Sequence, residues 1–128
     1  MTLAARIVQV NEYDLTDTAE AFVDAISALA ERTEREGHTG VLGYQFFVDR
    51  IEGKAGAVIQ YADAPAWLAH HRIAYEWHEM PALQATVSLT RLTLFGPFND
   101  ELREWLDGAG VSFVHLDELA SGFVRQLS

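Results

Sequence analysis

Two helical segments alternate with four strand-like segments over residues 4–96, and this order limits the folds open to the chain. Residues 17–37 carry apolar side chains at intervals of three and four, which is typical of a helix that buries one face. A second helix is expected to begin at Asp63 and to run to about Glu79, because Pro81 cannot continue it. Strands, in which side chains alternate along the chain, are expected at 4–13, 41–49, 55–61 and 87–96.

The resulting order, β-α-β-β-α-β, predicts an α+β fold of the ferredoxin-like type. Such a unit is an antiparallel four-stranded sheet with both helices packed on one face. A short turn at 50–54, which contains Gly53, is typical of a hairpin between the second and third strands. The first helix is expected to start with Asp17 and Glu20 as a capping pair.

Residues beyond this unit form an extension of their own. We assign residues 1–128 to a single domain, with a ferredoxin-like core at 4–98 and a C-terminal extension at 99–128. Asn99 is expected to cap a short helix, and 111–116 is expected to form a fifth strand. The sheet face that carries no helix would expose apolar side chains, so we predict that a second copy covers it in a homodimer, as a dimeric α/β barrel.

Charge and composition exclude several functional classes. The 128 residues contain 9 Lys and Arg against 19 Asp and Glu, a net charge of -10, and such a surface repels phosphate backbones and anionic lipids. We therefore predict neither a nucleic-acid partner nor a membrane partner. The sequence has no cysteine, which excludes disulfides, thiol nucleophiles and thiolate metal sites. With no secretory leader and no run of about 18 apolar residues, we expect a cytoplasmic protein.

The second predicted helix carries the most informative candidate site residues. Trp67, His71, Tyr75 and His78 fall on one stripe, at intervals of four, four and three. A polar and aromatic stripe on a helix that packs against a sheet predicts a partly polar cavity, and histidine can exchange a proton near neutral pH. The alternative is that these are ordinary amphipathic side chains at the rim of a helix, with their polar ends in water.

Two candidates lie on the predicted strands. Asn11 shares the half-polar face of the first strand with Gln9 and Tyr13, where it either contacts a ligand or satisfies local backbone groups. Arg91 interrupts an apolar alternation, so its charge must be paired or hydrated. It would bind an anionic group of a ligand, pair across a dimer, or face solvent.

The histidine spacing does not favour a metal site, and we predict none. His71 and His78 are seven residues apart, roughly 10 Å along a helix axis. His70 and His71 would point about 100° apart. Ligands from other elements, such as His38 or His115, remain the alternative.

Two segments resemble the antibiotic-biosynthesis-monooxygenase-like family. These are Tyr61-Ala62-Asp63 followed by Ala66-Trp67-Leu68-Ala69-His70-His71, and the stretch Leu92-Thr93-Leu94-Phe95-Gly96-Pro97-Phe98. The resemblance covers roughly residues 4–98 and implies a dimeric α/β barrel with a pocket between each sheet and its own helices. Some members of the family oxidise phenols or quinols with molecular oxygen, without metal or flavin, so the resemblance implies no cofactor.

The leading hypothesis that the resemblance implies is a cofactor-independent monooxygenase acting on a phenol- or quinol-like aromatic small molecule. In it His71 takes the phenolic proton, and Asn11 holds the developing oxyanion. The residues assigned to substrate binding are Trp67, Tyr75, His78 and Arg91. One alternative is a non-catalytic dimeric barrel that binds a hydrophobic ligand. A weaker one is haem degradation, because Asn11, Trp67 and His78 loosely match haem-degrading relatives.

Overall fold

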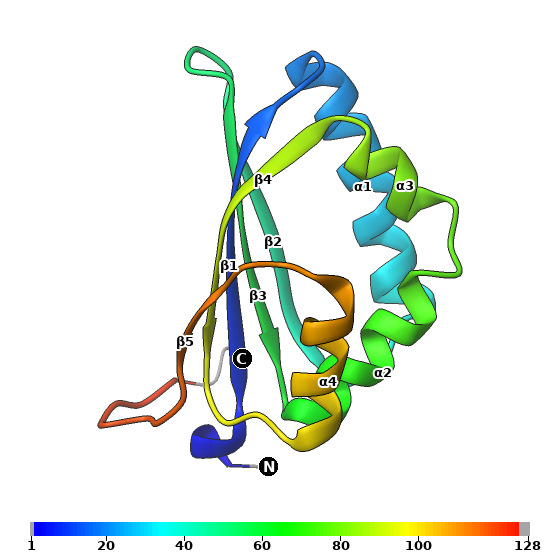
Figure 1. The fold of residues 1–128 in the computed structure, drawn as a ribbon. Helices are drawn as coiled ribbons and strands as arrows, with labels where there is room; N and C mark the ends of the chain where they lie inside the picture. The colour runs from blue at the N-terminus through cyan, green and yellow to red at the C-terminus, as the bar shows by residue number, and fades with distance from the viewer. Residues whose placement is uncertain (1, 126–128) are drawn as a thin grey trace.

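The computed structural model describes residues 2–125 and confirms the predicted order of elements. One five-stranded sheet, in the order β2-β3-β1-β4-β5, carries the helices on one face (Figure 1). Its strands are β1 (Ile7–Leu15), β2 (Val41–Asp49), β3 (Lys54–Tyr61), β4 (Val87–Phe95) and β5 (Val114–Leu116). The helices are α1 (Ala19–Glu36), α2 (Ala64–Ala74), α3 (Glu79–Gln84) and α4 (Asp100–Ala109), and a 3-10 turn, η1, covers Leu3–Ala5.

Strand β1 lies at the centre of the antiparallel part of the sheet and sets its register. Asn11 pairs with Ala57 of β3 on one side and with Leu92 of β4 on the other. The register of β1 and β4 shifts after Glu12, and Tyr13 then pairs with Leu89. Such a bulge bends the strand locally and changes the direction of the side chains beside it. The short strand β5 of the extension runs parallel to β4 at the sheet edge.

The first helix begins one residue later than its predicted capping pair. The N-cap is Thr18, whose side-chain oxygen accepts a hydrogen bond of 3.0 Å from the backbone N–H of Ala21. Asp17 instead accepts from the backbone N–H of Thr18, at 2.7 Å. Both side chains satisfy donors at the helix start, but a Thr in the N-cap position displaces the neighbouring Asp from that role.

The prediction that the second helix continues to about Glu79 was wrong. Helix α2 ends at Ala74, the chain turns through 75–78, and α3 begins at Glu79. In a continuous helix the ring of Pro81 would meet the carbonyl of Trp77, four residues before it. In the first turn of α3 the missing N–H of this proline removes no intrahelical hydrogen bond.

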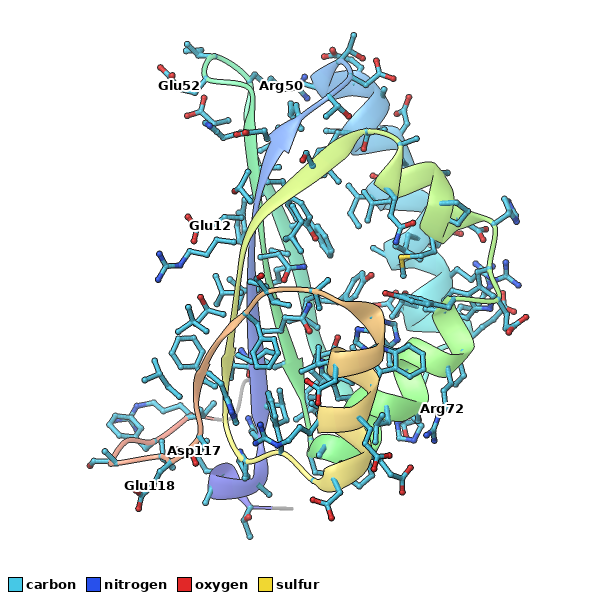
Figure 2. All side chains as sticks on the ribbon, in the orientation of Figure 1. Glu12, Arg50, Glu52, Arg72, Asp117 and Glu118 are labelled. Carbon is cyan, nitrogen blue, oxygen red and sulfur yellow. The ribbon has the colours of Figure 1, made fainter. Side chains whose placement is uncertain are left out.

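The two faces of the sheet differ in their surroundings. Ile7, Gln9, Asn11 and Tyr13 of β1 are all buried beneath the helices. The other face has no helix on it, and Figure 2 shows Glu12 pointing away from the helical side. Large apolar side chains of this outer face are exposed, among them Phe47, Phe95, Val114 and Leu116.

The extension adds a fourth helix on the same side as the others. As predicted, Asn99 caps α4, accepting a hydrogen bond of 2.8 Å from the backbone N–H of Leu102. Leu102 and Leu106 are buried, and α4 ends at Gly110, whose φ of 68° is left-handed. Across residues 2–125 no helix combines the length and the apolar character that a membrane span needs.

Candidate functional site

A cavity of about 210 Å³ lies between the sheet and the helices. Side chains of β1, β2, β3, β4 and of all four helices, α1 to α4, surround it. Its polar and aromatic lining residues are Gln9, Asn11, Tyr13, Tyr44, Phe46, Tyr61, Trp67, His70, His71, Tyr75, Gln84 and Trp105. An apolar cavity of about 150 Å³ holds a benzene molecule, so this volume fits one substituted aromatic ring. A wider depression of about 430 Å³ near the end of α1 contains none of the predicted site residues.

Four buried side chains form a continuous hydrogen-bonded row along one wall of the cavity. The indole N–H of Trp67, on α2, donates to Gln9 Oε1 at 2.8 Å. Gln9 Nε2 donates to Asn11 Oδ1 at 3.0 Å, and Asn11 Nδ2 donates to the hydroxyl oxygen of Tyr13 at 2.6 Å. Because residues 9, 11 and 13 of a strand share one face, three consecutive inward positions of β1 supply the row. We call Trp67, Gln9, Asn11 and Tyr13 the relay.

The ring of His71 lies flat against the ring of Trp67, which precedes it by one turn of α2. The ring centroids are 3.6 Å apart, and the planes differ by 19°. His71 Nδ1 lies 2.7 Å from the backbone carbonyl oxygen of Trp67, which can only accept, so the proton of the neutral ring is on Nδ1. Burial lowers the pKa of His71 to about 3, although this bond opposes the shift. The imidazole is therefore neutral at physiological pH, with the lone pair on Nε2.

His70 is the second imidazole of the cavity wall, and it is 2% exposed. Its ring centroid lies 5.4 Å from that of His71, 5.8 Å from Tyr44 and 5.9 Å from Tyr61. Its Nδ1 atom is buried and has no hydrogen-bond partner within residues 2–125. Burial, and to a smaller extent the proximity of His38, lowers the pKa of His70 to about 4. This ring is also neutral at physiological pH.

The tyrosines of the wall stay protonated. Burial raises the pKa of Tyr13, Tyr44, Tyr61 and Tyr75 above the ordinary value of a phenol. Each hydroxyl therefore keeps its proton at physiological pH. Trp105 of α4 completes the aromatic lining, with its ring centroid 6.3 Å from Trp67 and 5.6 Å from Tyr75.

The structure brings four of the six predicted site residues to this cavity: Asn11, Trp67, His71 and Tyr75. The other two lie elsewhere. His78 follows the end of α2, and its side chain is 85% exposed with Nδ1 3.4 Å from Glu79.

Arg91 also lies away from the cavity. It belongs to the outer face of the sheet, where its Nε is 3.6 Å from a carboxylate oxygen of Glu12, and both side chains are exposed. This pair is a hydrated surface contact, one of the outcomes expected for a charge in that strand. Among the described residues that line the cavity there is no arginine to pair with an anionic group of a ligand.

Among the cavity residues that were not singled out as site residues from the sequence are Gln9, Tyr13, His70 and Trp105. Tyr13 was recognisable as a neighbour of Asn11 on the same strand face, and His70 as a neighbour of His71. Trp105 was expected on the inward face of the short helix after Asn99, but its place in the cavity wall was not predictable, because the position of α4 depends on contacts far apart in the sequence. Within the described residues, no cluster of three or more histidine and carboxylate side chains could hold a metal ion.

Comparison with solved structures places the chain in the fold class of the antibiotic biosynthesis monooxygenase-like proteins. MupZ from Pseudomonas fluorescens is similar over 98% of this chain and 93% of its own, with a TM-score of 0.75 and 22% identity. SnoaB, a cofactor-independent oxygenase from Streptomyces nogalater, is similar over 75% of this chain and 96% of its own, with a TM-score of 0.59 and 17% identity. A candidate antibiotic biosynthesis monooxygenase from Caulobacter crescentus CB15 has a TM-score of 0.58 and 20% identity, over 71% of this chain and 86% of its own.

These likenesses confirm the predicted ferredoxin-like fold. A match over 98% of the chain includes α4 and β5, so MupZ shares the arrangement of the extension as well as that of the core. No family model matches the sequence, and no curated protein matches it significantly.

Proposed function

We propose that the protein is a cofactor-independent monooxygenase that oxidises a single-ring phenol or quinol with molecular oxygen. The observation that carries the proposal is the neutral imidazole of His71, which has Nε2 available in a cavity walled by aromatic rings. Nε2 would accept the hydrogen bond, and then the proton, of a phenolic hydroxyl group. The rings of Trp67, Tyr75 and Trp105 would pack against the substrate ring.

The chemistry needs no other redox group because the substrate supplies all the electrons. A phenolate adds oxygen at the ring carbon opposite its own oxygen, and the resulting hydroperoxide loses water to give a quinone. One phenol and one O₂ become one quinone and one water. One oxygen atom enters the product, and the other leaves as water. The residues of this chain would move the first proton and hold the developing negative charge.

The low pKa of His71 bears on whether the ring can act as a base. Moving a proton from a phenol, with a pKa of about 10, to an imidazole with a pKa of about 3 costs about 9.5 kcal/mol. A turnover of one per second corresponds to a barrier of about 17 kcal/mol, so the cost lies within reach. Attraction between imidazolium and phenolate lowers it further, as do the donors of Asn11 and Tyr13.

Oxygen uptake during incubation with single-ring phenols tests the proposal. We expect one O₂ consumed per quinone formed, and one labelled oxygen atom in the quinone when ¹⁸O₂ is supplied. His71→Phe keeps an aromatic ring over Trp67 and should lose turnover far more than ligand affinity, whereas His78→Phe, outside the cavity, should retain it. Equal turnover in His71→Phe would remove this residue from the mechanism, and no uptake with any phenol would refute the oxygenase.

The second candidate function is ligand binding without catalysis, and the same pKa favours it. An imidazole that resists protonation is a good hydrogen-bond acceptor and a weak base. Saturable binding of phenols without oxygen uptake would establish this alternative. Haem degradation has no such support, because His78, on which that alternative depended, lies outside the cavity.

We also propose that the outer face of the sheet pairs with a second copy of the chain. Phe47 is 60% exposed and Phe95 38%, and Val114 and Leu116 extend the same apolar surface. Exposed apolar side chains that share one face are typical of an interface. We expect a dimer in sedimentation experiments with the wild type and a monomer with Phe95→Glu, because the new carboxylate would be buried in the interface. Ile51→Glu, at an exposed hairpin turn, is the matched control and should leave the dimer intact.

A further inference from the structure

We infer that the Tyr13 hydroxyl is a specificity-determining hydrogen-bond donor that binds a carbonyl-type oxygen of the ligand. The ligand class is then an aromatic ring with both a hydroxyl group, held by His71, and a carbonyl oxygen, held by Tyr13. This inference deepens the proposed function and rests on the same cavity. It depends on the direction of each hydrogen bond in the relay.

The indole of Trp67 fixes the first direction. An indole N–H can only donate, so the Gln9 atom that faces it must be the amide oxygen. The amide nitrogen of Gln9 then faces Asn11, whose oxygen must accept. This leaves the Asn11 nitrogen as the donor to Tyr13. One donor at the start therefore determines the orientation of both amides.

The last link leaves the proton of Tyr13 available. Its hydroxyl oxygen accepts the 2.6 Å bond from Asn11, and among the described residues no acceptor is hydrogen-bonded to its own O–H. Tyr13 lines the cavity, so a ligand there can supply the acceptor. Hydrogen bonds that run in one direction polarise one another, which makes the final O–H a stronger donor than an isolated phenol.

The imidazole of His71, also on the cavity wall, has the opposite character, and Trp67 fixes its hydrogen-bonding direction too. The Trp67 carbonyl holds the proton of His71 on Nδ1, so Nε2 can only accept. A hydroxyl group of the ligand suits this nitrogen, and a carbonyl oxygen does not. The same tryptophan therefore orients the acceptor through its backbone and the donor through its side chain.

The requirement for both groups follows from the cost of leaving them unpaired. A ligand that lacks the carbonyl oxygen would displace water from the Tyr13 hydroxyl and offer nothing in return. Sites built around a buried polar group reject analogues that lack its partner more strongly than they reject an analogue with a missing methylene group. The relay would thus act as a selectivity filter as well as a structural row.

The test is anaerobic calorimetry with single-ring probes, so that no turnover disturbs binding. The reference is 3- or 4-hydroxyacetophenone, whichever binds more tightly. The matching ethylphenol lacks only the carbonyl oxygen, and acetophenone lacks only the hydroxyl group. For the wild type we expect each omission to weaken binding about tenfold, the size of one good hydrogen bond.

Three variants separate the two groups. Tyr13→Phe should abolish the preference for hydroxyacetophenone over ethylphenol and keep the preference over acetophenone. His71→Phe should do the reverse. Tyr44→Phe removes a different hydroxyl of the cavity wall and is the matched control, which should keep both preferences.

Gln9→Leu tests the role of the relay itself, because it cuts the row between Trp67 and Asn11. We expect it to reduce the carbonyl preference while the hydroxyl preference stays. An unchanged carbonyl preference in Tyr13→Phe would overturn the inference, as would failure of the wild type to prefer hydroxyacetophenone over ethylphenol. Intact preferences without oxygen uptake would refute only the proposed oxygenase.

Discussion

Acidification from pH 8 to pH 5 should destabilise the protein through the two imidazoles of the cavity wall, His70 and His71. The pKa of His70 is lowered to about 4 and that of His71 to about 3, against about 6.5 for histidine in an unfolded chain. Between pH 6.5 and pH 4 the unfolded chain therefore takes up protons that the folded protein does not. The free energy of unfolding is therefore unaffected by the protonation of these two histidines above pH 6.5, and it falls as the pH decreases toward their folded pKa values.

The expected magnitude follows from these pKa values. At pH 5 the pH is about 1.5 units below the pKa of a histidine in the unfolded chain, while the folded ring is still mostly neutral. Each pKa unit corresponds to about 1.36 kcal/mol. Each histidine therefore lowers the free energy of unfolding by about 2 kcal/mol, and the pair by about 4 kcal/mol. This is a large part of the stability of a small domain.

Urea unfolding at fixed protein concentration and at a series of pH values measures this loss. His70→Phe and His71→Phe should each remove about half of the excess pH dependence, whatever their stability at pH 8. His78→Phe is the reference variant, because the side chain of His78 is exposed and the substitution leaves both cavity histidines in place. The reasoning would be refuted if His71→Phe lost as much stability as this reference between pH 8 and pH 5.

Backbone geometry and helix capping give further predictions. Gly96 has a φ of 109°, and a Cβ atom there would lie 2.1 Å from the carbonyl oxygen of Arg6, so Gly96→Ala should cost more than about 3 kcal/mol in urea unfolding. Gly53→Ala is the matched control, since Gly53 also has a positive φ but open space around it, and should cost about 1 kcal/mol. An equal loss in both would contradict the steric argument. Thr18→Ala removes the N-cap bond of α1 and should cost about 1 kcal/mol, whereas Thr18→Ser should restore most of it.

Periodicity predicted the core fold well because its strands and helices each have a buried and an exposed side. The antiparallel sheet with its helices on one face also followed, since a β-α-β-β-α-β chain has few ways to pack two helices on one face of a sheet. The failures lie where local pattern and non-local packing disagree. His78 continues the stripe of Trp67 and His71 on an ideal helix, but the break before Pro81 moves it into solvent.

The candidate site was predictable only in part, and its missing members show why. Residue types and a shared strand face were enough to group Asn11 with Gln9 and Tyr13. They did not predict the direction of the hydrogen bonds among these side chains. That direction depends on Trp67, 58 residues away from Gln9 in the sequence. For Arg91, the alternation of β4 indicated a sheet face opposite to that of its apolar neighbours. Which of the two faces carries the helices depends on the packing of the whole sheet, so the sequence alone could not place Arg91 outside the cavity.

Helix α4 follows the last strand of the four-stranded unit, yet it supplies Trp105, Leu106 and Ala109 to the wall of the cavity. None of these residues takes part in the pairing of β1 to β4. Substitutions at them can therefore reshape the chamber without disturbing the register of the antiparallel strands. The antiparallel strands and α2 thus hold the polar contacts in place, and the later segment adds side chains that bound the volume of the cavity.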